Sequence, residues 1–113
     1  MKQLFLLIFL LSCFGSAIAC SKEKPINNKQ TFSDCLSLAE QGDVGSQLYI
    51  GLSYDIGQRV KKDYVLAHMW LNIAASNGNN DARNARLRMD SKMSTEQIHE
   101  AQRLAREWMA KHN

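Results

Sequence analysis

The chain has 113 residues, of which 45% are hydrophobic and 22% are charged, and its formal net charge is +3. This length suits one small domain, and the composition is typical of a globular protein. The charge excess is too small to indicate a nucleic-acid partner, and it falls to +2 if Lys2 leaves with an N-terminal signal. A small enzyme and a binding module both remain open.

Residues 1–19 are predicted to be an export signal. The segment has Lys2 near its start, an uncharged apolar run after it, and the small residues Ala17–Ala19 at its end. The run is too short, and too quickly followed by polar residues, to indicate a membrane span. We therefore expect the mature chain to begin at Cys20 and to work outside the cytoplasm.

Cys20 allows two interpretations. The segment "SAIAC" resembles a bacterial lipobox, which implies that Cys20 is acylated and anchors the protein to the periplasmic side of the outer membrane. Residues 20–31, polar and with the only proline, would then be a flexible tether for a domain over residues 32–113. The alternative is a disulfide between Cys20 and Cys35 in a soluble periplasmic or secreted protein.

Three helices are predicted in the first part of that domain. The first covers residues 32–41 and ends at Gly42, and the second opens at Asp43 and ends at Gly57. Asp63 is placed to cap the N-terminus of the third helix. Apolar residues with helical spacing line the first helix: Phe32, Cys35, Leu36 and Ala39.

The third predicted helix runs from Asp63 to about Asn77, and Gly78 suits the left-handed position after its end. Its polar residues form one narrow stripe, so neighbouring helices must cover it on more than one side. The stripe consists of His68, Asn72 and Ser76. We expect His68 at the exposed rim. Because adjacent helical residues point about 100° apart, His68 and Met69 cannot share a metal, and neither a metal site nor a cofactor is predicted.

A repeat underlies these helices. Ala39 and Gly42 recur as Ala75 and Gly78, in both cases 36 residues later, which indicates stacked helical hairpins. The pattern resembles the Sel-one-like repeat family, a relative of the tetratricopeptide repeats, and one complete repeat covers about residues 39–78. Twelve residues match the family pattern: Ala39, Gly42, Gly51, Tyr54, Gly57, Val60, Asp63, Ala67, Trp70, Ala74, Ala75 and Gly78.

The resemblance implies antiparallel helix pairs that stack into a superhelix and bind partner proteins. Arg59 departs from the pattern, because the family has a second loop glycine there, which puts the path of that loop in doubt. Some cysteine-rich relatives are described as β-lactam-hydrolysing or penicillin-binding, but this chain lacks their paired cysteines. It also lacks a placed serine nucleophile or another catalytic motif, so we predict no enzyme activity.

Two further helices are predicted after the repeat. The first has Ala82, Ala85 and Met89 on its inner side, and a turn at residues 91–93 follows it. Ser94 and Gln97 then form a capping box for a final amphipathic helix, with Met93 and Ile98 as a hydrophobic staple. The inner stripe of that helix is Ile98, Ala101, Ala105, Trp108 and Met109. The predicted fold is an all-α short solenoid of about five helices, closed by this C-terminal capping helix.

The best candidates for protein binding lie on the second predicted helix. Leu48, Leu52 and Ile56 are spaced i, i+4 and i+8, and Asp55 lies beside them. They either line a concave groove for a partner or are covered by the first helix. The expected partner is a protein of the bacterial envelope that the sequence does not identify. A toxic effector, with the chain as its immunity lipoprotein, is an alternative partner.

Overall fold

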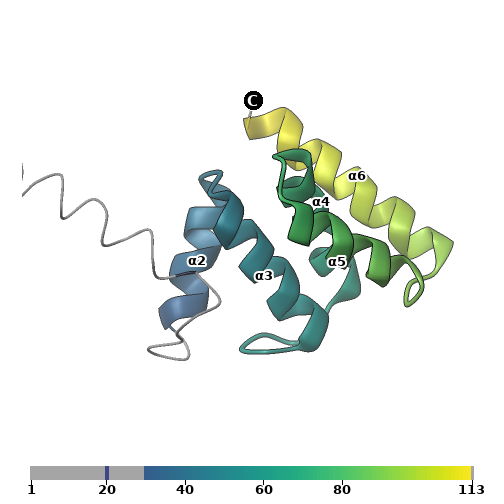
Figure 1. Cartoon of the computed structure of the whole chain (residues 1–113), viewed down its shortest axis with the longest axis horizontal. Helices are drawn as coiled ribbons and strands as arrows, with labels where there is room; N and C mark the ends of the chain where they lie inside the picture. Colours follow the sequence, from purple (N-terminus) through teal and green to yellow (C-terminus); the bar gives the residue numbers. More distant parts are fainter. Residues whose placement is uncertain (1–19, 21–29, 113) are drawn as a thin grey trace, which may run out of the picture.

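A computed structural model describes Cys20 and residues 30–112, and this part of the chain is all helical. It contains five helices and no strand (Figure 1). They are α2 (Gln30–Glu40), α3 (Val44–Ile56), α4 (Tyr64–Ser76), α5 (Asn80–Asp90) and α6 (Thr95–His112). The prediction of an all-α fold with about five helices is confirmed. Among these residues no helix is long and apolar enough to cross a membrane. The predicted signal, residues 1–19, lies outside the described residues.

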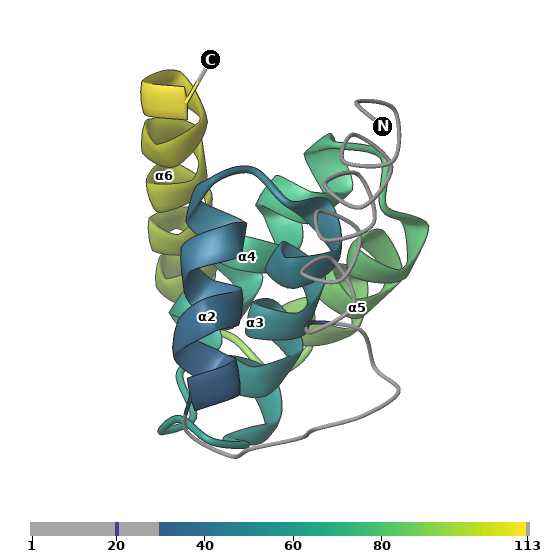
Figure 2. The same cartoon turned by 90° about the vertical axis from the view of Figure 1, so that its left-hand side faces the viewer.

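Helix α2 lies at one end of the molecule and α6 at the other, with α3, α4 and α5 between them (Figure 1). α3 packs against both α2 and α4, while α4 is the central helix and contacts α3, α5 and α6. In the view turned by 90°, α5 and α6 lie on opposite sides of α4 (Figure 2). The prediction that α4 must be covered on more than one side is confirmed.

The two turns that the repeat predicts have the same backbone geometry. Gly42 has φ +102° and its N–H donates to the carbonyl of Ala39, at 3.1 Å. Gly78 has φ +92° and donates to Ala75 at 3.0 Å. In each turn the next residue reaches back five residues: Asp43 donates to Leu38 at 3.0 Å, and Asn79 to Ala74 at 3.1 Å. Both turns are therefore Schellman motifs, which need a residue tolerant of positive φ.

Each turn leads directly into a capped helix. The Asp43 carboxylate accepts a hydrogen bond from the Ser46 N–H at 2.9 Å, and the Asn79 side chain accepts one from Ala82 at 2.8 Å. Asp63 caps α4 in the same way, through the N–H of Leu66 at 3.0 Å. These caps satisfy N–H groups that have no partner inside the helix, so they fix where each helix begins.

Two clusters of buried side chains form the core. The first core cluster joins α3, α4, α5 and α6, and it contains Leu48, Ala67, Leu71, Ala74, Ala82, Ala85, Met89, Met93 and Ala101. The second core cluster joins the N-terminal side to α4 and α6, and it contains Cys20, Cys35, Ala39, Ile50, Met69, Trp70, Ile73 and Ala105. Glycine at position 51 permits close packing of α3 on α4, because a Cβ there would lie 2.8 Å from the Leu71 side chain.

Arg59 lies in the loop between α3 and α4, whose path the sequence left open. Gly57 ends α3 with φ +71°, and Arg59 has φ +68°. Arg59 is the only non-glycine residue with positive φ in the part that the structure covers. Its guanidinium donates a hydrogen bond to the hydroxyl of Tyr49. Arg59 thus adopts the left-handed conformation that a glycine would adopt at lower cost.

The N-terminal side contains the disulfide that was one of the two interpretations of Cys20. Cys20 and Cys35 are bonded, with their Cα atoms 5.6 Å apart, and both are buried. The predicted tether, residues 20–31, is therefore held to α2 at Cys20, and its last residues, Gln30 and Thr31, already belong to α2. Residues 21–29 lie outside the described residues. A sulfur atom in a disulfide has no free valence for a lipid, so the two interpretations exclude each other in one molecule.

Helix α6 begins with the predicted capping box. The Ser94 N–H donates to the side-chain oxygen of Gln97 at 3.0 Å, and the Gln97 N–H donates to Ser94 Oγ at 3.1 Å. Met93 is buried, and Ala101 and Ala105 are fully buried in the first and second core clusters respectively. The outer face carries exposed ion pairs, and the hydrogen bond from Arg103 holds the pKa of Glu100 below its usual value. α6 therefore packs along α4; the sequence predicted a capping helix, but not which helix it covers.

Candidate functional site

His68 lies inside the molecule, and the prediction that it is a rim residue is wrong. Its side chain is only 2% exposed, and Nε2 lies 2.9 Å from Oδ1 of Asp90 at the end of α5. Because a carboxylate only accepts, Nε2 carries the proton and donates. Nδ1 is buried without a hydrogen-bond partner. The polar stripe of α4 is therefore covered by α5 at this end, and its next member, Asn72, accepts a hydrogen bond from Arg86 at 2.9 Å.

The predicted binding stripe on α3 is mostly covered. Leu48 is 8% exposed, and both Leu48 and Leu52 pack in the first core cluster with residues of α4 and α5. Asp55 is half-buried and pairs with Lys92, at 3.4 Å. Of the four predicted binding residues only Ile56 is exposed, at 60%. The stripe is therefore mostly covered rather than open as a groove, but neither alternative is correct as stated, because α4 and α5 cover it and not the first helix.

The helix that covers this stripe is not the one the sequence suggested. Phe32 and Leu36 of α2 pack with the second core cluster, and the Phe32 ring lies edge-on to Tyr54 with centroids 5.9 Å apart. Burial, with a further contribution from the charge of Asp63, raises the pKa of Tyr54. The other repeat residues occupy the expected core or turn positions, with Ala67 and Ala74 fully buried and Trp70 only 4% exposed.

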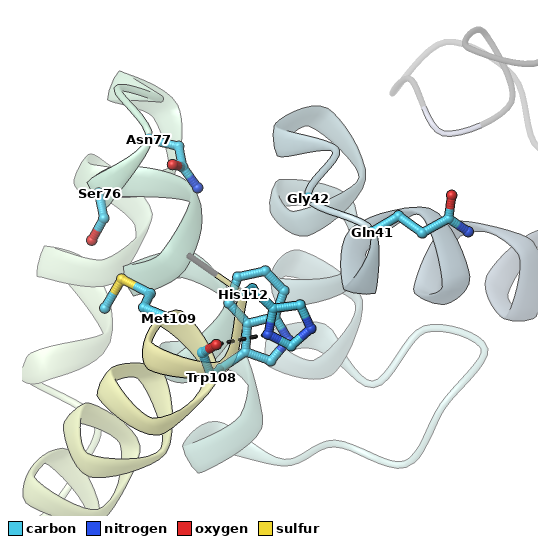
Figure 3. Close-up of a pocket in the computed structure, with 7 residues that line it drawn as sticks. All are labelled: Gln41, Gly42, Ser76, Asn77, Trp108, Met109 and His112. Carbon is cyan, nitrogen blue, oxygen red and sulfur yellow. Dashed lines mark hydrogen bonds between the residues drawn. The ribbon is translucent and has the colours of Figure 1, made fainter.

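A cleft of about 320 Å³ opens where three segments far apart in the sequence meet (Figure 3). The α2–α3 turn supplies one wall, the end of α4 supplies a second, and the last turns of α6 supply the third. The lining residues are Gln41, Gly42, Ser76, Asn77, Trp108, Met109 and His112. The cleft exists because the two Schellman turns lie at the same end of the stack and α6, packed along α4, extends to that end.

The aromatic wall of the cleft is fixed by contacts on both sides. The ring of His112 stacks on Trp108 with centroids 3.9 Å apart and planes 8° apart, and its Nδ1 is hydrogen-bonded to the Trp108 carbonyl at 2.7 Å (Figure 3). Trp108 also contacts the buried Trp70, with centroids 5.7 Å apart and planes at 65°. Trp108 is thereby anchored in the second core cluster, and the exposed His112 forms the outer surface of this wall.

The polar wall consists of Gln41, Ser76 and Asn77, and most of their side-chain donors are already hydrogen-bonded within the protein. Gln41 Nε2 donates to Ser37 Oγ at 3.2 Å, and Ser76 Oγ donates to the Asn72 carbonyl at 2.9 Å. Asn77 Nδ2 donates to the Ile73 carbonyl at 3.1 Å. The side-chain oxygens of these three residues retain accepting capacity. No Asp, Glu, Lys or Arg lines the cleft.

The arrangement does not resemble a catalytic centre. Ser76 and His112 both line the cleft, yet each forms its hydrogen bond with its own helix, so they are not paired as nucleophile and base. In the described residues no group of three or more His, Cys, Asp or Glu could hold a metal ion. What the cleft offers is a stacked aromatic surface, a thioether and several hydrogen-bond acceptors.

Sequence reasoning missed this cleft. Trp108 and Met109 were expected on the inner side of the capping helix, and both are half-buried at its end. A usable signal was the length of the inner stripe of α6, because an 18-residue helix extends a full turn beyond its 13-residue neighbour α4. Trp108 still packs on Trp70 of α4, but the residues after Met109 are exposed and reach the edge of the stack.

The fold and the cleft define this chain as an all-α protein of stacked helix hairpins with a ligand-sized cleft at one end of the stack. No protein-family model matches the chain, and no curated protein matches it.

Proposed function

We propose that the protein is an exported, non-catalytic module that binds another protein through the cleft between the two turns and α6. The observation that carries this proposal is the convergence of residues 41–42, 76–77 and 108–112 on one cleft. Sites that bind ligands are usually concave, largely preformed and built from an apolar surface with a few oriented polar groups. The fixed Trp108 ring, the Met109 side chain and the polar residues Ser76 and Asn77 meet that description.

We also propose membership of the Sel-one-like repeat family for residues 39–78. Features of both the sequence and the structure support this proposal. The Schellman turns at Gly42 and Gly78 share their hydrogen bonds, Gly51 sits where a side chain would collide with Leu71, and Arg59 adopts the conformation of the missing glycine. This family implies protein binding rather than catalysis.

For Cys20 we propose the disulfide form in the bacterial envelope, after removal of residues 1–19. Structural disulfides persist in oxidising compartments, so a buried Cys20–Cys35 bond supports export. The lipoprotein adaptor is the competing form. Intact-mass analysis of the protein purified from its own host distinguishes them. The proposed form begins at Cys20 and has lost the two thiol hydrogens, whereas acyl chains on Cys20 would overturn it.

Photo-crosslinking in cells tests the binding proposal. A photoreactive amino acid at position 41 lies at the cleft, whereas the same group at Arg103 lies on the exposed outer face of α6. We expect one discrete crosslinked protein from position 41 and none from position 103. Equal products from both positions, or none from position 41, would contradict the proposal. The identity of the captured protein separates an envelope-assembly partner from a toxic effector, and turnover of a β-lactam by the purified protein would replace binding with catalysis.

A further inference from the structure

Asn77 and Gly78 form the only Asn-Gly pair in the sequence. This pair is the dipeptide most prone to deamidation, because glycine has no side chain to hinder the attack of its own amide nitrogen on the asparagine Cγ. Asn77 is exposed, and a Cβ at Gly78 would meet no atom within 4 Å. Water and base can therefore reach this peptide bond, and the reaction needs no enzyme.

The closed α4–α5 turn holds the reacting groups apart. The Gly78 N–H, which must lose its proton, donates to the Ala75 carbonyl at 3.0 Å. The amide that must leave, Asn77 Nδ2, donates to the Ile73 carbonyl at 3.1 Å. Asn77 has ψ 13°, which places the Gly78 nitrogen beside the nitrogen of Asn77 itself and away from its Cβ. The turn must open, with rotation about ψ, before the ring of the intermediate can close.

The α2–α3 turn has the same geometry but a different residue before its glycine. Gln41 occupies the position of Asn77, 36 residues earlier, and both line the cleft (Figure 3). The two turns share their backbone hydrogen bonds. A glutamine side chain is one methylene longer, so attack on it closes a six-membered ring, which forms far more slowly than the five-membered succinimide. The chain therefore contains the same turn with and without a reactive side chain.

From these observations we infer that Asn77 is a deamidation site whose reaction is controlled by opening of the α4–α5 turn. In the open turn the Gly78 nitrogen loses its proton to solvent base and attacks Asn77 Cγ. The N–Cγ bond forms, the Cγ–Nδ2 bond breaks, and the amide leaves as ammonia after taking up a proton. Water then opens the succinimide at either of its carbonyls, which leaves aspartate or isoaspartate at position 77.

The product weakens the turn that protected the site. A carboxylate at position 77 donates no hydrogen bond, yet it would face the Ile73 carbonyl and the Gln47 side-chain oxygen, which lie 3.1 and 3.5 Å from Asn77 Nδ2. It also places negative charge at the C-terminal end of α4. In isoaspartate the backbone is one methylene longer, which displaces the N–H groups of Gly78 and Asn79 from their carbonyl partners. The reaction also puts a carboxylate into a cleft lining that has no Asp or Glu.

Peptide mass mapping of the purified, disulfide-bonded protein tests this inference after incubation at mildly alkaline pH, folded or in guanidinium chloride. Deamidation adds one mass unit, and fragmentation assigns it to a residue. We expect position 77 to react about tenfold faster or more in denaturant, because the folded turn is open only part of the time. Gln41 should stay intact in both samples. Equal rates in the two samples would overturn the control by the turn, and no product in denaturant would overturn the site.

Two cap substitutions distinguish opening of the turn from unfolding of the whole domain. Asn79→Ala removes the side chain that caps α5 through the Ala82 N–H, and it should accelerate deamidation of the folded protein about fivefold. Ser94→Ala removes a comparable cap from α6, beyond the opposite end of α5, and should leave the rate unchanged. Equal acceleration by both variants would overturn the assignment to the turn.

Exchanging the two residues between the turns tests the role of the side chain. Asn77→Gln should abolish the product at position 77, and Gln41→Asn should create a second site in the α2–α3 turn that also reacts faster in denaturant. Asn77→Asp reproduces one product and should raise the equilibrium constant of unfolding about fivefold or more. If Asn77→Asp were neutral, the inferred effect of deamidation on the turn would be wrong.

The modification site and the proposed binding function are independent. If position 77 deamidates as expected while position 41 crosslinks no protein in cells, the binding function is wrong and the modification site stands. If position 41 crosslinks a partner while position 77 gives no product in denaturant, the modification site is wrong and the binding function stands.

Discussion

Residues 38–46 and 74–82 form two turns with the same backbone hydrogen bonds, but the helices that follow them differ at equivalent positions. Gln47 of α3 is fully buried and its Nε2 donates to the carbonyl of Ala39 at 3.1 Å, whereas Arg83, 36 residues later, is exposed. Gly51 lies against α4, whereas its counterpart Leu87 is 52% exposed.

This comparison separates what makes a turn from what continues the stack. The turn needs a small residue, a glycine with positive φ and a capping residue, and both copies have them. Continuing the stack also needs a smooth face on the next helix. α3 provides it at Gly51, and α4 packs there. α5 has Leu87 instead, and α6 packs along α4. This leaves the ends of α2, α4 and α6 around one cleft.

The largest expected effect comes from breaking the disulfide, because it acts on only one side of the comparison. Cys20 and Cys35 close a loop with a sequence separation of 15, and opening it should lower the free energy of unfolding by about 3 kcal/mol. α2 packs mainly on α3, so the first turn should loosen most. Amide hydrogen exchange with and without reductant measures this. We expect faster exchange at Gly42 and Asp43 than at Gly78 and Asn79, and equal acceleration of both pairs would contradict it.

Substitutions at positions 51 and 87 give the next largest effect. Gly51→Leu forces a side chain into Leu71 and should cost about 2 kcal/mol, which is the overpacking penalty less the gain in helix propensity. Leu87→Ala, at the exposed counterpart, should change stability by less than about 0.5 kcal/mol. Urea unfolding of both variants provides the measurement. If the two variants lost similar amounts of stability, position 87 of α5 would be as closely packed as position 51 of α3, which would contradict the comparison.

Gln47 and Arg83 test the contact between the first turn and α3. Gln47→Ala removes the hydrogen bond to the Ala39 carbonyl and should cost about 1 kcal/mol, since Ala39 keeps its second partner, the N–H of Gly42. Arg83→Ala serves as the matched control and should be neutral. Thermal unfolding resolves a difference of this size. A neutral Gln47→Ala would mean that the buried amide does not stabilise the turn.

The smallest expected effect concerns Tyr54, whose equivalent position in the repeat, 36 residues later, is occupied by Asp90. Because burial raises the pKa of Tyr54, the folded protein holds that proton more tightly than the unfolded chain does. Its contribution to stability is therefore complete below about pH 10, the usual tyrosine pKa, and is lost as the pH rises through the raised pKa. Tyr54→Phe should show a shallower loss of stability in alkaline urea titrations. An unchanged slope would contradict the assignment.

Local features of the fold were predictable from the sequence, and tertiary ones were not. The caps at Asp43 and Asp63 and the capping box at Ser94 depend on residues within three positions of each other, so the sequence contains them entirely. The burial of His68 and Leu48 depends on α5, which begins at residue 80. The helical periodicity of α4 and α3 shows that these faces must be covered, but not by which helix.

The candidate site was less predictable than the fold. Cys20 could be acylated or disulfide-bonded, and a cysteine followed by polar residues is compatible with both. The cleft required two turns and the end of α6 to meet, and no spacing in the sequence relates residue 41 to residue 112. Only the 36-residue repeat, which places Gly42 and Gly78 at the same end of the stack, could have supplied part of that information.

The most direct test of the account is an NMR titration of the ¹⁵N-labelled oxidised protein with the partner protein that the crosslink at position 41 captures. We predict that the amides of Gln41 and Asn77 and the indole N–H of Trp108 shift together with one dissociation constant, because all three belong to one cleft. The amide of Ile56, at the far end of α3, should remain unchanged. Shifts centred on Ile56, or shifts at one turn without the other, would contradict the cleft as the binding site.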